Sequence, residues 1–413
     1  MRQSIIFILY LLCTFTTRSQ SVLTPEQAGS IYYAYPAPPS TYTPAPTGYE
    51  PFYISHYGRH GSRWMTADER YTEVVCVFDS LYQCSELTPL GVDVRERLHK
   101  VWEDARGCSG SITPLGERQH REIAERMYRN FPQVFRGGAF IDARSSTSLR
   151  CAMSMSYFTE RLKELNPGLQ VNRRAYHRYM DYIAYTSPEG EKFASEKAPW
   201  RRGFREFEKK NVRPERLMAS LFVKPEAITD QDAMMRSLYW IAADMQNVEL
   251  DLSFYDIFEY EELVGVWKTV NARMYVCNAA APLNGGLMPR CAVPLLRNIL
   301  ESADAAIEKG TPAADLRFGH DTHLIRLLAL MQIEGCSNQE VDMEKFHLAW
   351  QDYRVSPMGA NLQLIFYRDK KNDILVKFLL NECEVALPLK SKMVPYYSWK
   401  EVETFLAEVI GKE

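Results

Sequence analysis

The chain has 413 residues, 46% hydrophobic and 24% charged, and its 49 Lys and Arg nearly balance its 52 Asp and Glu. This composition is ordinary for a globular protein, and the length favours one large domain with an insertion, or two domains. The charge balance argues against a nucleic acid as the main partner. Any basic binding site must therefore be local.

Residues 1–19 have the pattern of a secretory signal peptide. Arg2 precedes the apolar run SIIFILYLLCTF, and Thr17 and Ser19 are the small residues expected around a cleavage site near Ser19. The run is too short for a membrane span, and no second segment of that length follows. We therefore expect an exported protein, periplasmic or secreted, with no integral membrane segment after cleavage.

Eight cysteines follow this leader: Cys76, Cys84, Cys108, Cys151, Cys277, Cys291, Cys336 and Cys383. An oxidising compartment would permit disulfides. Cys277 with Cys291, and Cys76 with Cys84 or Cys108, are the local candidates, and buried free thiols are the alternative. No CxxC pair or clustered Cys/His spacing indicates zinc, and we expect neither a metal nor an organic cofactor.

The first half of the chain alternates between irregular, strand and helix patterns. Residues 20–48 are rich in Pro, Tyr, Ser and Thr, which predicts an extended arm that wraps the domain or a flexible lead-in. The stretch PFYISHY (51–57) predicts a strand. Two stretches that begin Thr-Pro-Leu-Gly, at Thr88 and Thr113, predict helices with a Thr N-cap and a Pro at the first position. Residues 135–165 predict a strand, a Ser/Thr-rich turn and a helix that opens near Thr147.

The second half predicts a helical insertion followed by a return to the sheet. Residues 156–284 are rich in aromatic and basic residues with helical periods, which indicates a mostly helical cap. After it come a helix (292–310), a strand, turn and helix (314–331) and a β-hairpin (361–381). We therefore predict an α/β fold with a central, mostly parallel sheet flanked by helices. Residues 49–155 and 285–413 would form this core, and 156–284 the cap.

The stretch ISHYGRHGSRW (54–64) places Arg59, His60 and Arg63 around two glycines, where a predicted strand ends. Open α/β sheets bind ligands at such strand ends. The guanidinium group of arginine can donate two parallel hydrogen bonds to the oxygens of a phosphate. A neutral histidine between two such arginines can attack phosphorus. The turn therefore indicates phosphoryl transfer. A surface turn whose arginines face water is the alternative.

Two later motifs supply candidate partners. In RFGHDTHL, His320 and Asp321 lie between a strand and a helix, where His320 can donate to a phosphate and Asp321 can protonate a leaving oxygen. The alternative for Asp321 is an N-cap on the following helix. In ARSSTSLRC, Arg144 and Arg150 lie near a helix N-terminus, which favours anions.

Together the three motifs resemble the histidine acid phosphatase family, which includes phytases and multiple inositol polyphosphate phosphatases. The resemblance spans roughly residues 50–413. It implies that His60 is the nucleophile that forms a phosphohistidine and that Asp321 is the proton donor. It also implies a phosphate clamp made of Arg59, Arg63, Arg150 and His320.

The resemblance chooses Arg150 over Arg144 because the spacing from Arg150 to Phe158 matches the helix that carries the family's distal arginine. Arg144 is then a candidate for contacting the residues that bind the phosphate, without binding it itself. The chain departs from the family pattern in two places. Trp64 follows Arg63 where the family continues Arg-x-Pro, and the motif that begins at His320 reads His-Asp-Thr where the inositol polyphosphate branch often has His-Ala-Glu.

Other basic residues are weaker candidates. We expect His56 to be a structural residue at the strand end and His323 to lie beside the site without a catalytic role. The basic run 200–216 would either steer a phosphorylated substrate or form a solvated helix surface. The same alternatives apply to a second basic group, Arg173, Arg174, His177 and Arg178.

The sequence thus predicts an exported phosphomonoesterase that hydrolyses organic phosphates, most simply inositol polyphosphates such as phytate. A protonated Asp321 would give it an acidic pH optimum and a bell-shaped pH profile. The alternatives are a broad-specificity acid phosphatase, a phosphotransferase with the same nucleophile, a non-catalytic phosphate-binding protein and a metal-dependent hydrolase.

Overall fold

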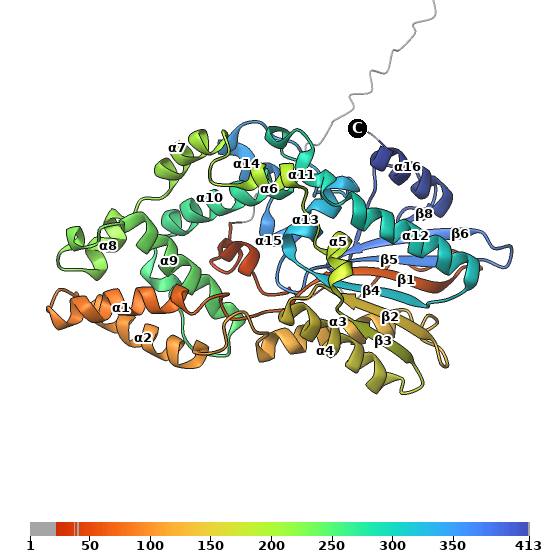
Figure 1. The fold of residues 1–413 in the computed structure, drawn as a ribbon, viewed down its shortest axis with the longest axis horizontal. Coiled ribbons are helices and arrows are strands. Elements are labelled where there is room, and N and C mark those ends of the chain that lie inside the picture. The colour runs from red at the N-terminus through yellow and green to blue at the C-terminus, as the bar shows by residue number, and fades with distance from the viewer. Residues whose placement is uncertain (1–21, 37, 39–40, 412–413) are drawn as a thin grey trace, which may run out of the picture.

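The computed structural model describes residues 22–36, 38 and 41–411, so the predicted signal peptide lies outside the described residues. An eight-stranded sheet with helices on both faces forms the centre of the fold (Figure 1). Along the sheet the strands follow the order β3-β2-β4-β1-β5-β6-β7, and β8 pairs with β6. Their bounds are β1 (Glu50–Arg59), β2 (Phe140–Ser145), β3 (Gln170–Arg174), β4 (Ala314–Gly319), β5 (Asn361–Arg368), β6 (Ile374–Leu380), β7 (Cys383–Val385) and β8 (Tyr396–Ser398).

Four neighbouring strands, β3, β2, β4 and β1, run parallel to one another. Strand β5 is antiparallel to β1 and pairs with β6 in the hairpin that the alternation over 361–381 predicts. The predicted α/β class, with a central sheet flanked by helices, is confirmed. Because parallel strands end at the same edge of a sheet, the residues that follow β1, β2 and β4 meet there.

Alternating residues of β1 pack into two different cores, as strand geometry requires. Ile54 lies in one cluster with Ile123 of α3 (Pro114–Asn130) and Phe158 of α4 (Leu149–Leu165). Tyr53 lies in the other cluster with Ile299 of α12 (Val293–Lys309). The second face also carries α5 (Met180–Ile183), α13 (Asp321–Leu330) and α16 (Trp399–Gly411).

A helical lobe lies beyond the edge of the sheet (Figure 1). In it α1 (Glu69–Gln83) and α2 (Pro89–Ala105) share a hydrophobic core with α8 (Glu215–Leu221) and α9 (Gln231–Asp244). Thr88 and Thr113 cap α2 and α3 as predicted, since their hydroxyls accept from Gly91 N at 3.0 Å and from Gly116 N at 3.2 Å.

The helical lobe contains helices from both the predicted core (49–155) and the predicted insertion (156–284). Helices α1 and α2 belong to 49–155, whereas β3 lies in the sheet although it falls within 156–284. The division into core and insertion remains a prediction, and we propose that the insertion begins after Arg174 and shares its core with α1 and α2. The remaining helices are α6 (Pro188–Ala194), α7 (Arg201–Asn211), α10 (Tyr260–Asn278), α11 (Leu287–Arg290), α14 (Phe346–Ala349) and α15 (Asp352–Val355).

Part of the Pro/Tyr-rich arm is a folded element. Residues 27–32 form η1 (Gln27–Tyr32), a 3-10 turn with Ala28, Gly29, Ser30 and Tyr32 buried. Its neighbours are α9, α10 and α15. The composition of the arm gave no sign of this turn. Further 3-10 turns are η2 (His177–Tyr179), η3 (Pro225–Ala227), η4 (Met245–Asn247), η5 (Tyr255–Ile257), η6 (Pro282–Asn284) and η7 (Met343–Lys345).

All eight cysteines of the described residues are free thiols. The local pairings of Cys277 with Cys291, and of Cys76 with Cys84 or Cys108, are therefore not formed. Within residues 22–36, 38 and 41–411, no helix has the length and apolar character needed to cross a membrane.

Candidate active site

The candidate site is built where β1 and β4 end at the parallel edge of the sheet. Arg59 is the last residue of β1 and Gly319 the last of β4, so His60 and His320 follow at the same level. Two glycines permit close packing here. A Cβ at Gly319 would lie 2.1 Å from the Tyr57 hydroxyl oxygen, and one at Gly61 would lie 2.7 Å from the carbonyl oxygen of Gly116. Larger residues would push these turns apart.

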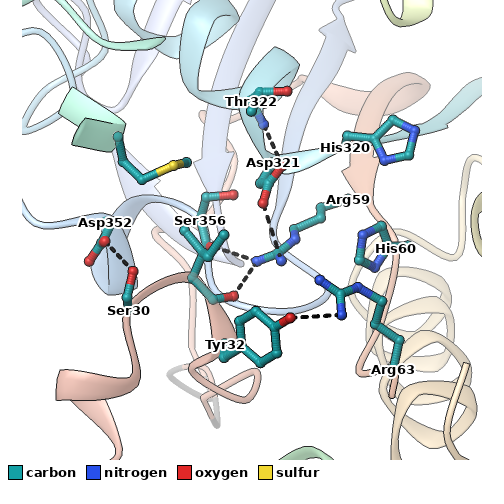
Figure 2. Close-up of polar contacts among 12 residues, drawn as sticks. Ser30, Tyr32, Arg59, His60, Arg63, His320, Asp321, Thr322, Asp352 and Ser356 are labelled. Atoms are coloured by element: carbon teal, nitrogen blue, oxygen red, sulfur yellow. Dashed lines mark hydrogen bonds and ion pairs between the residues drawn. The ribbon is translucent and has the colours of Figure 1, made fainter. Parts of the chain in front are cut away.

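Arg59 is fully buried and fixed at one end of its guanidinium. Its Nη1 donates to the carbonyl oxygens of Ile31 at 2.6 Å and Ser356 at 2.8 Å, while Nη2 lies 3.3 Å from Asp321 Oδ2 (Figure 2). Burial lowers the pKa of Arg59 to about 10, and Asp321 opposes that shift. The guanidinium therefore stays charged at neutral and acidic pH.

His60 is buried, and its ring is oriented by the backbone that follows it. Its Nδ1 lies 2.9 Å from the carbonyl oxygen of Gly61, an oxygen that can only accept. Nδ1 therefore carries the proton and Nε2 keeps its lone pair. Burial lowers the pKa of His60 well below its usual value, and Arg59, Arg63 and Arg150 lower it further. The ring is neutral, as a nucleophile must be.

Arg63 is held by a residue of the arm. Its Nη1 donates to the Tyr32 hydroxyl at 3.1 Å (Figure 2). The same nitrogen donates to the Trp64 carbonyl at 2.9 Å. The guanidinium carbon also lies 4.8 Å from the centre of the Tyr32 ring, a cation–π distance. Burial opposes the charge of Arg63, but Tyr32 and Asp244 raise its pKa above the usual value.

His320 completes the wall opposite His60. The two ring centres are 5.8 Å apart. Its Nε2 lies 3.3 Å from Ser146 Oγ, and its Nδ1 lies 3.5 Å from Nη2 of Arg150 at the start of α4. Burial lowers the pKa of His320 to about 4, with Arg150 adding to the shift. The ring is therefore neutral above about pH 4 in the unliganded site.

Asp321 opens α13, with its carboxylate turned toward Arg59. Its Oδ1 accepts from the backbone N of Thr322 at 2.8 Å. Burial favours the protonated acid, but Arg59, His320 and that backbone N–H outweigh it, so the pKa of Asp321 lies below its usual value. The carboxylate is thus ionised without substrate, which differs from the protonated state expected from the sequence.

Several guanidinium nitrogens at the site are buried without a hydrogen-bond partner among the described residues. They are Nε and Nη2 of Arg59, Nε of Arg63 and Nε of Arg150, and of these only Arg59 Nη2 has an ion pair, with Asp321. Buried donors are nearly always paired, so such a group needs an explanation. The three guanidinium groups therefore form a binding site for an anion that has several oxygens to accept their hydrogen bonds.

The structure therefore brings six predicted residues together: Arg59, His60, Arg63, Arg150, His320 and Asp321. Arg144 makes other contacts. Its guanidinium pairs with Asp142 on its own strand and lies 3.4 Å from Asp315 on β4. Asp142 also pairs with Arg174, so these residues form a charge ladder on the sheet. The supporting role of Arg144 behind the phosphate site stays a prediction.

The two other histidines of these motifs, His56 and His323, lie in packed surroundings. His56 lies between Phe158 and Phe318, with ring centres 5.4 and 5.2 Å away, and burial lowers its pKa to about 3. It is a structural strand residue, as expected. His323 contacts Thr322, and burial lowers its pKa to about 3 as well.

The basic run 200–216 is largely engaged by carboxylates. Lys210 pairs with Glu344 at 2.7 Å, Arg201 with Glu196 at 3.0 Å, and Arg216 with Glu262. These pairs favour the solvated-surface alternative. The second basic group differs, because Arg173, His177 and Arg178 are exposed around the end of β3.

Three contributors to the site carry no sequence signal. Ile31 and Ser356 act through backbone carbonyls, which any residue supplies. Tyr32 is one of many tyrosines in an irregular segment. Within the described part of the chain, no group of three or more His, Cys, Asp or Glu side chains is arranged to hold a metal ion.

The fold is that of a histidine phosphatase. A family model described as the histidine phosphatase superfamily (branch 2) matches residues 59–381. The chain belongs to this family, as the three motifs predicted, and is a phosphatase. No curated protein sequence matches it.

Solved structures with the same fold are multiple inositol polyphosphate phosphatases and phytases. The Bifidobacterium longum multiple inositol polyphosphate phosphatase in complex with inositol hexasulfate is 18% identical, with a TM-score of 0.77 over 93% of this chain and 98% of that one. Its phosphate complex is 19% identical, with a TM-score of 0.78 over the same shares, 93% and 98%. The phytase from D. castellii is 15% identical, with a TM-score of 0.65 over 94% of this chain and 85% of that one.

Proposed function

We propose that the protein is an exported phosphomonoesterase that hydrolyses inositol polyphosphates such as phytate through a phosphohistidine on His60. One observation carries this proposal. The Nε2 lone pair of His60 is free because Nδ1 is bonded to Gly61, and guanidinium donors without partners surround it. Such an arrangement suits in-line attack on a bound phosphate.

In the first step, the scissile phosphate lies among Arg59, Arg63 and Arg150, which offset its charge. His60 Nε2 attacks phosphorus, and the bond between phosphorus and the ester oxygen breaks. Asp321 gives its proton to the leaving oxygen, which departs as the alcohol. His320 donates to a phosphate oxygen as charge builds up there.

In the second step, water attacks the phosphohistidine. Asp321, now a carboxylate, accepts a proton from this water as the new bond to phosphorus forms. The bond between phosphorus and His60 Nε2 breaks, and inorganic phosphate leaves. Water and the ester have become alcohol and phosphate. The departing phosphate takes the proton from Asp321, so the enzyme returns to its starting state, with Asp321 ionised, without a cofactor.

The proton for the first step arrives with the substrate. Asp321 is ionised in the free site because Arg59 holds its pKa down. A phosphomonoester loses its last proton near pH 6. A monoanionic phosphate can therefore pass its proton to Asp321 as it binds, while the resulting dianion draws the arginines away from the carboxylate.

The polyphosphate preference is supported by the surface after β3. Arg178 is exposed and stacks on Tyr176 and Tyr179, with its guanidinium carbon 5.3 and 5.5 Å from their ring centres. The segment that follows reaches the site, because the Ile183 carbonyl accepts from the Tyr57 hydroxyl at 2.9 Å. An exposed cation five residues before this contact suits a further phosphate on the same ring.

Phosphate release from phytate and from a simple aryl phosphate, between pH 4 and 7 with EDTA present, tests the proposal. We expect release from phytate that EDTA does not change and that His60→Ala abolishes. Release from the aryl phosphate alone would leave a broad-specificity phosphatase. Transfer of phosphate to an added alcohol in place of water would identify a phosphotransferase. Release that EDTA abolishes would indicate a metal-dependent hydrolase, and no turnover would indicate a binding protein.

A further inference from the structure

We propose that Tyr32, supplied by the N-terminal arm, is a positioning residue of the phosphate site that acts through Arg63. This inference rests on the proposed function. Tyr32 lies outside residues 59–381, the part of the chain that the family model matches. The arm would then be a working part of the enzyme and not a lead-in to it.

Two contacts hold Arg63 on Tyr32. The hydroxyl accepts from Nη1 at 3.1 Å, and the ring lies 4.8 Å from the guanidinium carbon. The Trp64 carbonyl oxygen also accepts a hydrogen bond from Nη1, at 2.9 Å. With Nη1 engaged twice, the plane of the guanidinium is fixed, and its unpartnered Nε remains for the phosphate. Tyr32 thereby reduces the freedom that Arg63 would lose on binding substrate.

The neighbouring residue of the arm does the same for Arg59. The Ile31 carbonyl accepts from Arg59 Nη1 at 2.6 Å. Two adjacent arm residues therefore hold two of the guanidiniums that flank His60 (Figure 2). A displacement of the arm would release both arginines together.

The arm is itself tied to the catalytic turn. Asn247 Nδ2 donates to the Tyr32 carbonyl at 2.9 Å, and Asn247 Oδ1 accepts from Ser62 Oγ at 2.7 Å. One amide side chain thus joins the arm to the residue two positions after His60. On the other side, the Tyr32 ring packs against Trp240 with ring centres 5.0 Å apart.

A buried carboxylate anchors the arm one residue before the contacts with Arg59. Ser30 has a left-handed backbone, with φ 61° and ψ −134°, which is costly for a residue other than glycine. Its hydroxyl donates to Asp352 (Figure 2). The other carboxylate oxygen of Asp352 accepts from Trp267 Nε1 at 3.1 Å. The fold maintains a strained turn here, and that turn directs Ile31 and Tyr32 toward the arginines.

A double-mutant cycle between Tyr32→Phe and Arg63→Lys tests whether Tyr32 acts through Arg63. Tyr32→Phe keeps the ring and removes the acceptor for Nη1. We expect it to lower kcat/KM for phytate by roughly 10-fold, the loss of one hydrogen bond to a charged group. In the Arg63→Lys background the same change should cost less than about 2-fold, because the geometry it maintains is already lost.

Inorganic phosphate provides a readout that does not depend on turnover. We expect Tyr32→Phe to weaken its binding, measured by calorimetry, about as much as it lowers kcat/KM. The control is Tyr33→Phe, since Tyr33 packs on Tyr353 at 5.9 Å between ring centres and is the next residue of the arm. This control should leave phosphate binding and kcat/KM unchanged.

Equal losses from Tyr32→Phe with and without Arg63 would overturn the inference, as would phosphate binding unchanged from wild type. If His60→Ala abolishes activity and Tyr32→Phe does not alter it, the proposed function stands and the inference fails alone. If His60→Ala and Arg63→Lys are both without effect on turnover and phosphate binding, the proposed function fails and takes the inference with it.

Discussion

The Nδ1 atom of His60 lies 2.9 Å from the carbonyl oxygen of Gly61. That contact assigns the ring proton to Nδ1 and leaves Nε2 as the atom that can attack. Burial and the neighbouring guanidiniums keep the ring neutral, because they hold the pKa of His60 well below its usual value. The catalytic account follows from this orientation.

Replacing His60 should remove turnover and leave the fold intact. We expect His60→Ala to lower kcat by ~10³-fold or more, the range found when a covalent nucleophile is lost. Steady-state phosphate release measures this. His99→Ala is the matched control, since His99 pairs with Asp79 on the helical lobe and should keep full activity. A His60→Ala enzyme within a few-fold of wild type would rule out the nucleophile assignment.

The effect of Asp321→Asn should depend on the leaving group. An alkyl phosphate needs a proton on its leaving oxygen, so we expect kcat to fall by ~10²–10⁴-fold, the size of a general-acid contribution. A nitrophenyl phosphate leaves as a stable phenolate, so its first step should be affected far less. Burst kinetics separate the two steps. Equal losses of the first step for both substrates would contradict a proton-donor role.

The pH profile should be asymmetric and not a symmetric bell. The pKa of His60 is well below its usual value, and the pKa of His320 is about 4. Both rings therefore stay neutral, and we expect no loss of kcat/KM between pH 5.5 and about 4.5. Above about pH 6 the substrate loses the proton that Asp321 needs, and the rate should fall. A profile of kcat/KM for a simple alkyl phosphate measures this. A rate that climbs into alkaline pH would exclude the mechanism.

Asp352 should make the stability of the protein depend on pH. Burial raises its pKa to about 6, above the 3.8 of an ordinary Asp. The folded state therefore holds this proton more tightly, and the associated stability is complete below about pH 4 and lost as pH rises through 6. The shift is worth about 3 kcal/mol at 1.36 kcal/mol per unit.

Asp352→Asn removes this titration. The difference in unfolding free energy between wild type and the variant should therefore change by about 3 kcal/mol between pH 4 and pH 7, in favour of the variant at the higher pH. Denaturant titrations at both pH values give this difference. If the difference in unfolding free energy between wild type and Asp352→Asn does not vary with pH, Asp352 does not titrate as stated.

Arg178 should matter only for substrates with several phosphates. We expect Arg178→Ala to raise KM for phytate by roughly 3- to 10-fold, the loss of one partly exposed charge contact, and to leave KM for an aryl phosphate unchanged. Arg136 is the control, because it is also exposed and lies 3.8 Å from Glu50 at the opposite end of β1. The same loss on both substrates would place Arg178 outside substrate recognition.

Much of the site could be predicted because it lies in short stretches. Arg59, His60 and Arg63 share one turn, and His320 and Asp321 share another, each directly after a strand with recognisable periodicity. The parallel strand order then brings the two turns together. Arg150 needed the family resemblance, since a basic residue near a helix N-terminus is common.

The contribution of the arm could not be predicted. The Ile31 carbonyl is a backbone group, and Tyr32 sits in a segment without period. Their positions depend on contacts with residues more than 200 positions away, such as Asn247. The packing of α1 and α2 on α8 and α9 was missed for a similar reason, because an amphipathic pattern marks a buried face but not its partner.

The most direct test of the account is to trap the covalent intermediate. The Asp321→Asn enzyme is mixed with a nitrophenyl phosphate, quenched in alkaline denaturant and analysed by peptide mass spectrometry. The account predicts one added phosphoryl group on the peptide that contains His60, at the ring nitrogen and absent from His60→Ala. A burst of nitrophenolate with no phosphoryl group on His60, or with the group on another residue, would contradict it.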